Sequence, residues 1–168
     1  MKTIYLLLVL PFCLAAQHNF EAIDNNVIWE QIFEDTVSTK DLIVQINKNI
    51  SQKNSAILED KNTYGQSTYM DLIKDKKSLS AFFKQQARFG YSVEFKENKY
   101  RVTVRNIAFK GIAISLYGVT NDSDTYLDAS LIRSRDGQLR KNKMSNKVLN
   151  QLNIAFTKIF TYKAEKDW

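Results

Sequence analysis

Residues 90–106, GYSVEFKENKYRVTVRN, contain the most regular pattern in this chain. Apolar and polar residues alternate on both sides of a short polar break, and the apolar positions are Tyr91, Val93, Phe95, Tyr100, Val102 and Val104. Alternation with a period of two is typical of strands that bury one face. Asn98-Lys99 in the break suits a tight turn, because asparagine tolerates a positive φ. The stretch therefore predicts an antiparallel hairpin.

The position of this turn predicts the pairing of side chains across the hairpin. Phe95 pairs with Val102 on the buried face. On the opposite face Lys96 lies directly across from Arg101, a like-charge pair that Glu94 partly offsets from a diagonal position.

The sequence on either side predicts further strands and two helices. Val27–Phe33 is β-branched and aromatic, which indicates a strand. Ser38 lies three residues before Asp41, a capping-box-like start for a helix that runs to about Ile50. The apolar positions change from even to odd near Arg105-Asn106, which predicts a bulge. The remaining expectations are strands at Ser55–Glu59, Gly65–Ile73 and Ile112–Val119, a short helical turn or a strand at Ser78–Gln86, a long mobile loop at about Thr120–Lys143, and a final helix from about Ser145.

This order of elements predicts an α+β fold, an antiparallel sheet with both helices on one face. The other sheet face is then open. The side chains expected to point from it are Glu94, Lys96, Arg101, Thr103 and Arg105.

The first 16 residues, MKTIYLLLVLPFCLAA, are typical of a secretory signal peptide. Lys2 precedes an apolar run, and the small residues Ala15 and Ala16 follow it. The run is shorter than the ~20 apolar residues of a membrane span. Cys13 raises the alternative of a lipoprotein, but the bulky Phe12 before it fits that processing poorly. We expect cleavage after Ala16, export, and a periplasmic or secreted protein that does not span the membrane.

Removal of 16 residues from 168 leaves enough chain for one domain with a hydrophobic core. We expect a flexible lead at 17–26, a single domain at 27–163 and a charged tail at 164–168. Hydrophobic residues make up 44% of the chain, which excludes a disordered protein. The formal charge of +6 favours anionic partners only mildly.

Four stretches together resemble a known family: the signal peptide, VIWEQIFE at 27–34 with the capped helix after it, YSVEFKENKYRVTVRNI at 91–107, and LNIAFTKIF at 152–160 before the terminal KDW. They are similar to a family of exported bacterial domains of unknown function, described as having a TATA-binding-protein-like fold. The resemblance covers Val27 to Asn106 best and then the last helix, while Lys110 to Lys143 adds little. Lys99 departs from the family pattern, where Arg or Gly is more familiar.

The resemblance implies a curved antiparallel sheet backed by two helices, and it brings no catalytic residues with it. The fold's namesake binds DNA, but fold does not transfer function, and an exported domain rarely meets DNA. We therefore expect no nucleic-acid partner.

The residue types exclude several kinds of catalytic site. His18 is the only histidine and lies beside the expected cleavage point, which argues against Ser-His-Asp and Cys-His sites and against a histidine-ligated metal. Glycines are scattered, so no phosphate-binding loop is indicated. We expect no catalytic residue, no metal and no cofactor. The neighbouring carboxylates Asp122/Asp124 and Glu59/Asp60 leave a hydrolase as a remote alternative, although turn residues explain them better.

Two groups of basic residues are candidates for ligand binding. Lys96, Arg101 and Arg105 are the more informative group, because a sheet fixes their spacing. The other group is Arg133, Arg135, Arg140, Lys141, Lys143 and Lys147, which a solvated loop explains better. The sequence thus predicts a non-enzymatic module that binds an envelope protein or an anionic ligand through an open sheet face or an edge. The alternative is a structural envelope module whose sheet face is covered by residues 110–143.

Overall fold

The computed structural model describes residues 19–34, 37–50, 56–58, 62–116, 119–121 and 123–163. The expected signal peptide, the charged tail, Asp122 and the Glu59/Asp60 pair lie outside these residues.

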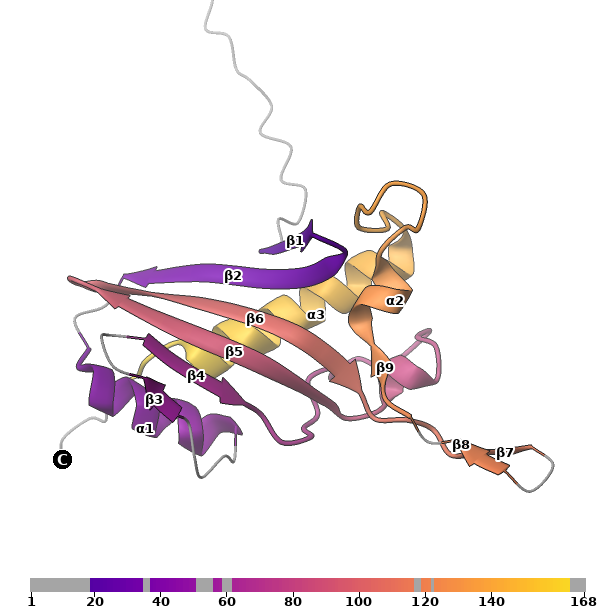
Figure 1. Ribbon diagram of the computed structural model, residues 1–168, viewed down its shortest axis with the longest axis horizontal. Coiled ribbons are helices and arrows are strands. Elements are labelled where there is room, and N and C mark those ends of the chain that lie inside the picture. Colours follow the sequence, from indigo (N-terminus) through magenta and orange to yellow (C-terminus); the bar gives the residue numbers. More distant parts are fainter. Residues whose placement is uncertain are drawn as a thin grey trace, which may run out of the picture.

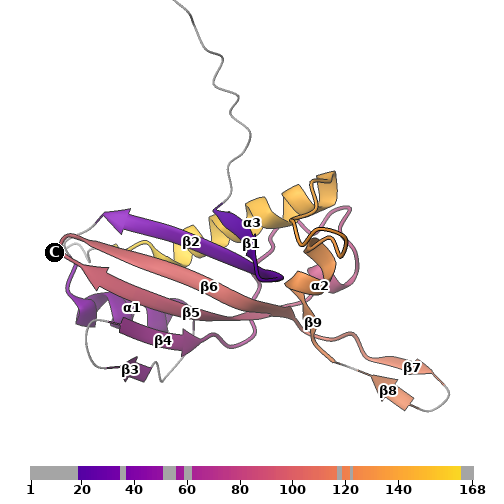
Figure 2. The same cartoon turned by 45° about the horizontal axis from the view of Figure 1, so that its top comes forward.

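The described chain forms an antiparallel sheet in the order β1-β2-β6-β5-β4-β3, with β9 paired to the end of β6. A second sheet of two short strands, β7 and β8, extends away from it (Figures 1 and 2). The strands are β1 (Phe20–Ile23), β2 (Asn26–Glu34), β3 (Ala56–Leu58), β4 (Asn62–Gln66), β5 (Ala87–Lys96), β6 (Lys99–Phe109), β7 (Ile114–Leu116), β8 (Val119–Asn121) and β9 (Thr125–Tyr126).

Two long helices lie behind the same face of the sheet (Figure 1). They are α1 (Thr39–Ile50) and α3 (Lys143–Phe160), and a short helix, α2 (Leu127–Leu131), packs against β2 and β6. A 3-10 turn, η1 (Phe82–Lys84), is the helical alternative of the two expected for that region. The predicted α+β fold with an antiparallel sheet and helices on one face is confirmed.

The helices begin where their capping residues indicate. The Ser38 hydroxyl accepts a hydrogen bond from the Asp41 amide at 3.1 Å and donates one to its carboxylate at 2.6 Å, as the sequence predicts. The last helix begins slightly earlier than expected, because the Asn142 side chain accepts from the Ser145 amide.

The core lies between the sheet and the two helices. The alternating valines of β5 and β6 are fully buried, as predicted. Trp29 of β2 packs against Phe156 and Phe160 of α3, and its indole nitrogen donates to Asn153 at 2.8 Å. These aromatic contacts attach α3 to one face of the sheet. In the part of the chain that the structure describes, no helix lies over the other face (Figure 1).

The register of the central hairpin differs from the predicted one by two residues. Glu97 and Asn98 form the turn, with Asn98 at φ 57°, and Phe95 pairs with Tyr100. Lys96 therefore lies opposite Lys99, so the predicted Lys96–Arg101 pairing is wrong. The assignment of faces is nevertheless correct, because a shift of two residues keeps every side chain on its side of a pleated sheet.

The bulge predicted near Arg105-Asn106 is confirmed. The pairing of β5 with β6 shifts between Arg88 and Gly90, and Asn106 adopts φ 54°. The extra residue lets Ile107 turn into the core after Val104.

Two segments expected to lack regular structure contain it. Within 17–26, Phe20–Ile23 form β1, because Phe20 is buried against Phe156 and the turn at Asp24-Asn25 has two positive φ angles that suit a hairpin. Within 120–143 lie the end of β8, β9 and α2, and α2 is held by its buried leucines.

The strand expected at Gly65–Ile73 is shorter than predicted and starts earlier. It is β4, which ends at Gln66. Beyond it Met70 forms only an isolated bridge with Ala87, while Leu72 and Ile73 are buried. Apolar burial here does not depend on strand pairing.

Candidate functional site

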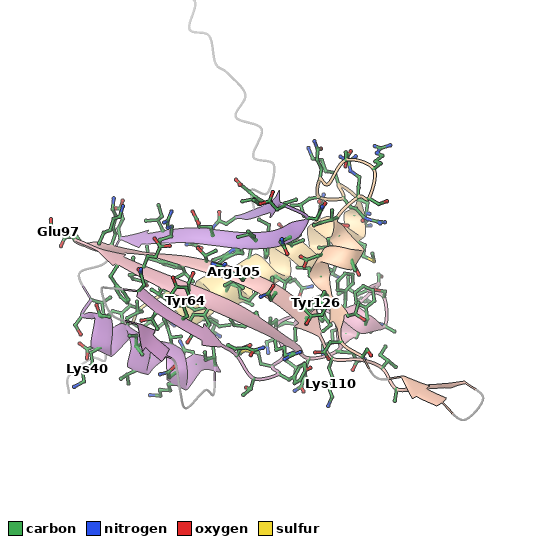
Figure 3. All side chains as sticks on the ribbon, in the orientation of Figure 1. Lys40, Tyr64, Glu97, Arg105, Lys110 and Tyr126 are labelled. Atoms are coloured by element: carbon green, nitrogen blue, oxygen red, sulfur yellow. The ribbon has the colours of Figure 1, made fainter. Side chains whose placement is uncertain are left out.

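The uncovered side of the sheet is defined here as the open face, the residues that alternate away from α1 and α3. Pairing across the strands places on it Glu21, Ile28, Glu30, Ile32, Glu34, Asn62, Tyr64, Gln66, Gly90, Ser92, Glu94, Lys96, Lys99, Arg101, Thr103 and Arg105. In Figure 3 Tyr64 and Arg105 lie over the strands on the side that faces the viewer, and Glu97 marks the tip of the hairpin. The five side chains predicted to point this way do so.

The structure brings two of the three candidate ligand residues together and separates the third. Lys96 and Arg101 line one small hollow of about 100 Å³ at the hairpin end of the open face, together with Ile32, Glu94, Lys99 and Tyr100. Arg105 lies four residues farther along β6, about 13 Å away at the usual strand rise. Any ligand small enough for this hollow does not reach Arg105.

Arg101 is held by carboxylates from both neighbouring strands. Its guanidinium lies 2.5 Å from a carboxylate oxygen of Glu94 on β5 and 3.8 Å from one of Glu30 on β2. The hydrogen bond to Glu94 and the two negative charges raise the pKa of Arg101 further above its ordinary value. Arg101 is thus neutralised within the sheet.

Other cations of the open face are not neutralised in this way. Among the described residues, Lys96, Lys99 and Arg105 take part in no ion pair, and all three are exposed. Arg105 lies opposite Gly90, which has no side chain to cover it. These three cations are the ones that a partner could reach.

The open face also exposes large apolar side chains. Ile32 is 57% exposed beside the small hollow, and Tyr64 is 42% exposed on β4. The described residues between 110 and 143 do not cover them, because β7 and β8 extend away from the sheet and α2 packs at its far end (Figure 2). The described part of this segment therefore gives no support to a self-covered sheet face.

One cluster was not predicted from the sequence. Asp124 accepts hydrogen bonds from Tyr69 at 2.5 Å and from Arg88 at 2.9 Å, and the Arg88 guanidinium lies 5.5 Å from the centre of the Tyr69 ring. Hydrogen bonds from Tyr69 and Arg88 hold the pKa of Asp124 below its usual value. Burial, reinforced by the contact with Asp124, raises the pKa of Tyr69. The cluster fixes the chain where it returns from β8 to the sheet. No local motif could reveal it, because its members are far apart in sequence.

The basic group at 133–147 is dispersed into separate contacts rather than gathered into one patch. Arg133 and Arg135 pair with Asp136, Lys147 pairs with Asp75, and Arg140 donates to the Ile132 carbonyl. The structure thus agrees with a solvated loop leading into α3.

Within the described ranges, no group of three or more His, Cys, Asp or Glu side chains is placed to hold a metal ion. In the same residues no helix combines the length and the apolar character needed to cross a membrane.

No protein-family model and no curated protein sequence matches this chain. Two solved structures are similar to it. One is a TBP-like protein from Parabacteroides distasonis, with 11% identity, a TM-score of 0.46, and coverage of 82% of this chain and 92% of that one. The other is a DUF4468 family protein from Bacteroides ovatus, with 12% identity, a TM-score of 0.39, and coverage of 86% and 92%. Both descriptions agree with the family resemblance stated from the sequence.

Proposed function

We propose that this protein is an exported, non-enzymatic interaction module that contacts a partner protein through the open face. The observation that supports the proposal is a sheet face that no described helix covers. It exposes Ile32 and Tyr64 beside Lys96, Lys99 and Arg105, three cations that form no ion pair with any described residue. Exposed aromatic and aliphatic side chains with a polar surround are typical of protein interfaces.

The balance of charge on the open face favours a protein over a polyanion. Four basic side chains (Lys96, Lys99, Arg101 and Arg105) share it with four acidic ones (Glu21, Glu30, Glu34 and Glu94). A surface without net charge does not concentrate nucleic acid or anionic glycan by long-range attraction. A protein surface can complement both signs at once.

Site-specific photocrosslinking in the native cells tests this proposal. A photoreactive residue at Tyr64, on the open face, is expected to give a discrete adduct with one protein. The same residue at Lys40, on α1 behind the sheet (Figure 3), is the matched control and is expected to give none. Equal labelling from both positions, or none from Tyr64, would contradict the proposal.

Charge reversal then identifies the cations involved. We expect Lys99→Glu combined with Arg105→Glu to abolish the Tyr64 adduct while thermal unfolding followed by circular dichroism stays unchanged. The double reversal Lys141→Glu with Lys143→Glu changes the net charge equally, at exposed positions just before α3 and at its first residue. It is expected to leave the adduct intact.

Export is the second part of the proposal and rests on the basic, apolar and small-residue order of residues 1–16. Mass spectrometry of protein purified from the cell envelope or the medium is expected to find an N-terminus at Gln17. A lipid-modified Cys13 or an intact Met1 would contradict it.

One observation favours a structural envelope module instead, namely the internal neutralisation of Arg101 by Glu30 and Glu94. That alternative predicts no adduct from any open-face position. A hydrolase has no comparable support, because each of the three described hollows is lined by a single carboxylate, Asp41, Glu94 or Asp71.

A further inference from the structure

On the helix side of the sheet, away from the open face, lies another hollow that is larger than the one beside Arg101 and is lined by more apolar residues. It has a volume of about 440 Å³ and lies between α3 and the segment that follows β4. Its lining is largely apolar and consists of Met70, Leu72, Ile154, Ala155 and Ile159, with Asn49, Asp71, Lys74, Gln151 and Lys158 around them. A volume of this size with a mainly apolar lining and a few polar groups is typical of sites for small ligands.

Ile154 is the most unusual residue of this hollow. It is 67% exposed, the largest value among the exposed large hydrophobic residues of the described chain. It contributes little to the core, which α3 reaches through the opposite side of the helix, at Leu152 and Phe156. Together with the other apolar residues of the lining, this side chain gives the hollow a surface that a ligand could bury.

The polar groups around the hollow have a basic excess. Lys158 follows Ile154 by one helical turn, and among the described residues it takes part in no ion pair. Lys74 lies on the facing segment. The carboxylate in the lining, Asp71, is already paired with Lys76 at 2.8 Å.

The amide side chains around the hollow are also committed to the protein. Asn49 donates to the Ile159 carbonyl at 2.8 Å, and Gln151 exchanges two hydrogen bonds with the backbone of Asp75. Lys74 and Lys158 are therefore the polar groups of the lining that suit an added anion.

We propose that this hollow binds a single-chain anionic amphiphile, a free fatty acyl carboxylate. The acyl chain lies along Ile154, Met70 and Ile159, and the carboxylate lies near Lys158. A concave site between a helix and a loop suits one chain better than it suits the flat surface of a bilayer. The site lies behind the sheet and is independent of the open face and its partner.

Heteronuclear NMR titration of the mature chain with octanoate, decanoate and dodecanoate, below their micelle concentrations, tests the proposal. Amide shifts are expected at Ile154, Ala155 and Lys158. Each fully buried methylene raises affinity about fourfold, equivalent to ~0.8 kcal/mol. Since a hollow open on one side buries about half of the chain, we expect about fourfold per two methylenes. Shifts elsewhere, or no dependence on chain length, would overturn the proposal.

Changing the charge of the ligand's head group, or of Lys158, distinguishes an anion-selective site from general apolar adsorption. Dodecyltrimethylammonium, with the same chain and the opposite charge, is expected to bind at least fivefold more weakly than dodecanoate. Lys158→Glu is expected to cost about fivefold in dodecanoate affinity, equivalent to ~1 kcal/mol for reversing an exposed charge. The control Lys141→Glu is expected to cost nothing. Equal affinity for both head groups would show general apolar adsorption and refute an anion-selective site.

Vesicles of phosphatidylcholine with phosphatidylglycerol distinguish a lipid surface from a free acyl chain. Binding to these vesicles without any dodecanoate shift would refute the proposal in favour of a membrane surface. Ile154→Asp places a charge in the apolar lining and is expected to abolish dodecanoate binding. Because Ile154 is exposed, the variant's thermal unfolding is expected to match that of the native chain, which separates a local loss of binding from unfolding.

Discussion

Tyr100 connects the hairpin of β5 and β6 to the C-terminal end of α3 through two hydrogen bonds of its hydroxyl. Its ring is buried, stacked at 4.9 Å on Phe33. The hydroxyl donates to the Phe160 carbonyl at 2.7 Å and accepts from the Tyr162 amide at 3.2 Å. The last carbonyls of a helix have no partner within it, so this hydroxyl satisfies one of them.

Replacement of Tyr100 by phenylalanine removes both hydrogen bonds and keeps the ring. An intramolecular hydrogen bond contributes about 1 kcal/mol net, and a buried group left without a partner costs about 1–3 kcal/mol. Since Phe160 is fully buried and water cannot replace the lost donor, we expect Tyr100→Phe to lower the free energy of unfolding by about 2 kcal/mol. For a domain of this size that corresponds to a fall in Tm of about 4–8 °C.

Urea unfolding followed by circular dichroism measures the change. The midpoint is expected to fall while the slope with urea stays constant, because the unfolded chain exposes the same surface. Tyr126→Phe is the matched control, since Tyr126 is 46% exposed, and it is expected to change stability by less than about 0.5 kcal/mol. If Tyr100→Phe unfolds at the same urea concentration as Tyr126→Phe, the hydroxyl does not connect the sheet to the helix.

Three further changes test other parts of the structure. The folded-state pKa of Asp124 lies below the unfolded value near 3.8, so its carboxylate stabilises the fold above that pH, and the contribution is lost as pH falls through the lower pKa. In urea titrations the free energy of unfolding that Asp124→Asn loses relative to the native chain is therefore expected to be full at pH 7 and to shrink below about pH 4. Gly65→Ala is expected to lower the free energy of unfolding by about 1–3 kcal/mol, because the added Cβ would overlap the Tyr91 ring. Gly90→Ala is the control and is expected to melt near the native temperature, because a Cβ at Gly90 meets its nearest atom at 3.6 Å. Ser38→Ala removes the N-cap of α1 and is expected to lower the free energy of unfolding, measured by chemical denaturation, by about 1 kcal/mol. An unchanged denaturation midpoint would contradict a stabilising role of the cap.

The alternation in residues 91–104 was sufficient to assign side chains to faces but not to fix their cross-strand partners. A two-residue shift preserves the faces, so the buried valines and the exposed arginines were predicted correctly from the period alone. The partner of Arg101 depends on which two residues form the turn, and asparagine adopts a positive φ at either central position. The sequence therefore predicted a repulsive pair where the structure has an attractive one with Glu94.

Contacts between distant segments account for the rest of the difference. Asp24-Asn25 carries a recognisable hairpin signal, but the polar residues around it obscure a strand that one aromatic residue, Phe20, anchors. The association of Tyr69, Arg88 and Asp124 depends on the path of the chain after β6, which no local pattern specifies. The hollow beside Ile154 was missed for the same reason, because the residues around it come from three separate segments.

The lengths of the strands have a consequence for crowded solutions. The two central strands span 10 and 11 residues, whereas the outermost strands span 4 and 3. Among the described strands, β1 covers only Asn26–Trp29 of β2, and residues 30–34 pair with β6 alone, but the outer strands themselves are brief. Brief outer strands are a known protection against stacking into fibrils. We therefore expect concentrated samples to stay free of cross-β aggregates, and lengthening β3 with β-branched residues to remove that protection.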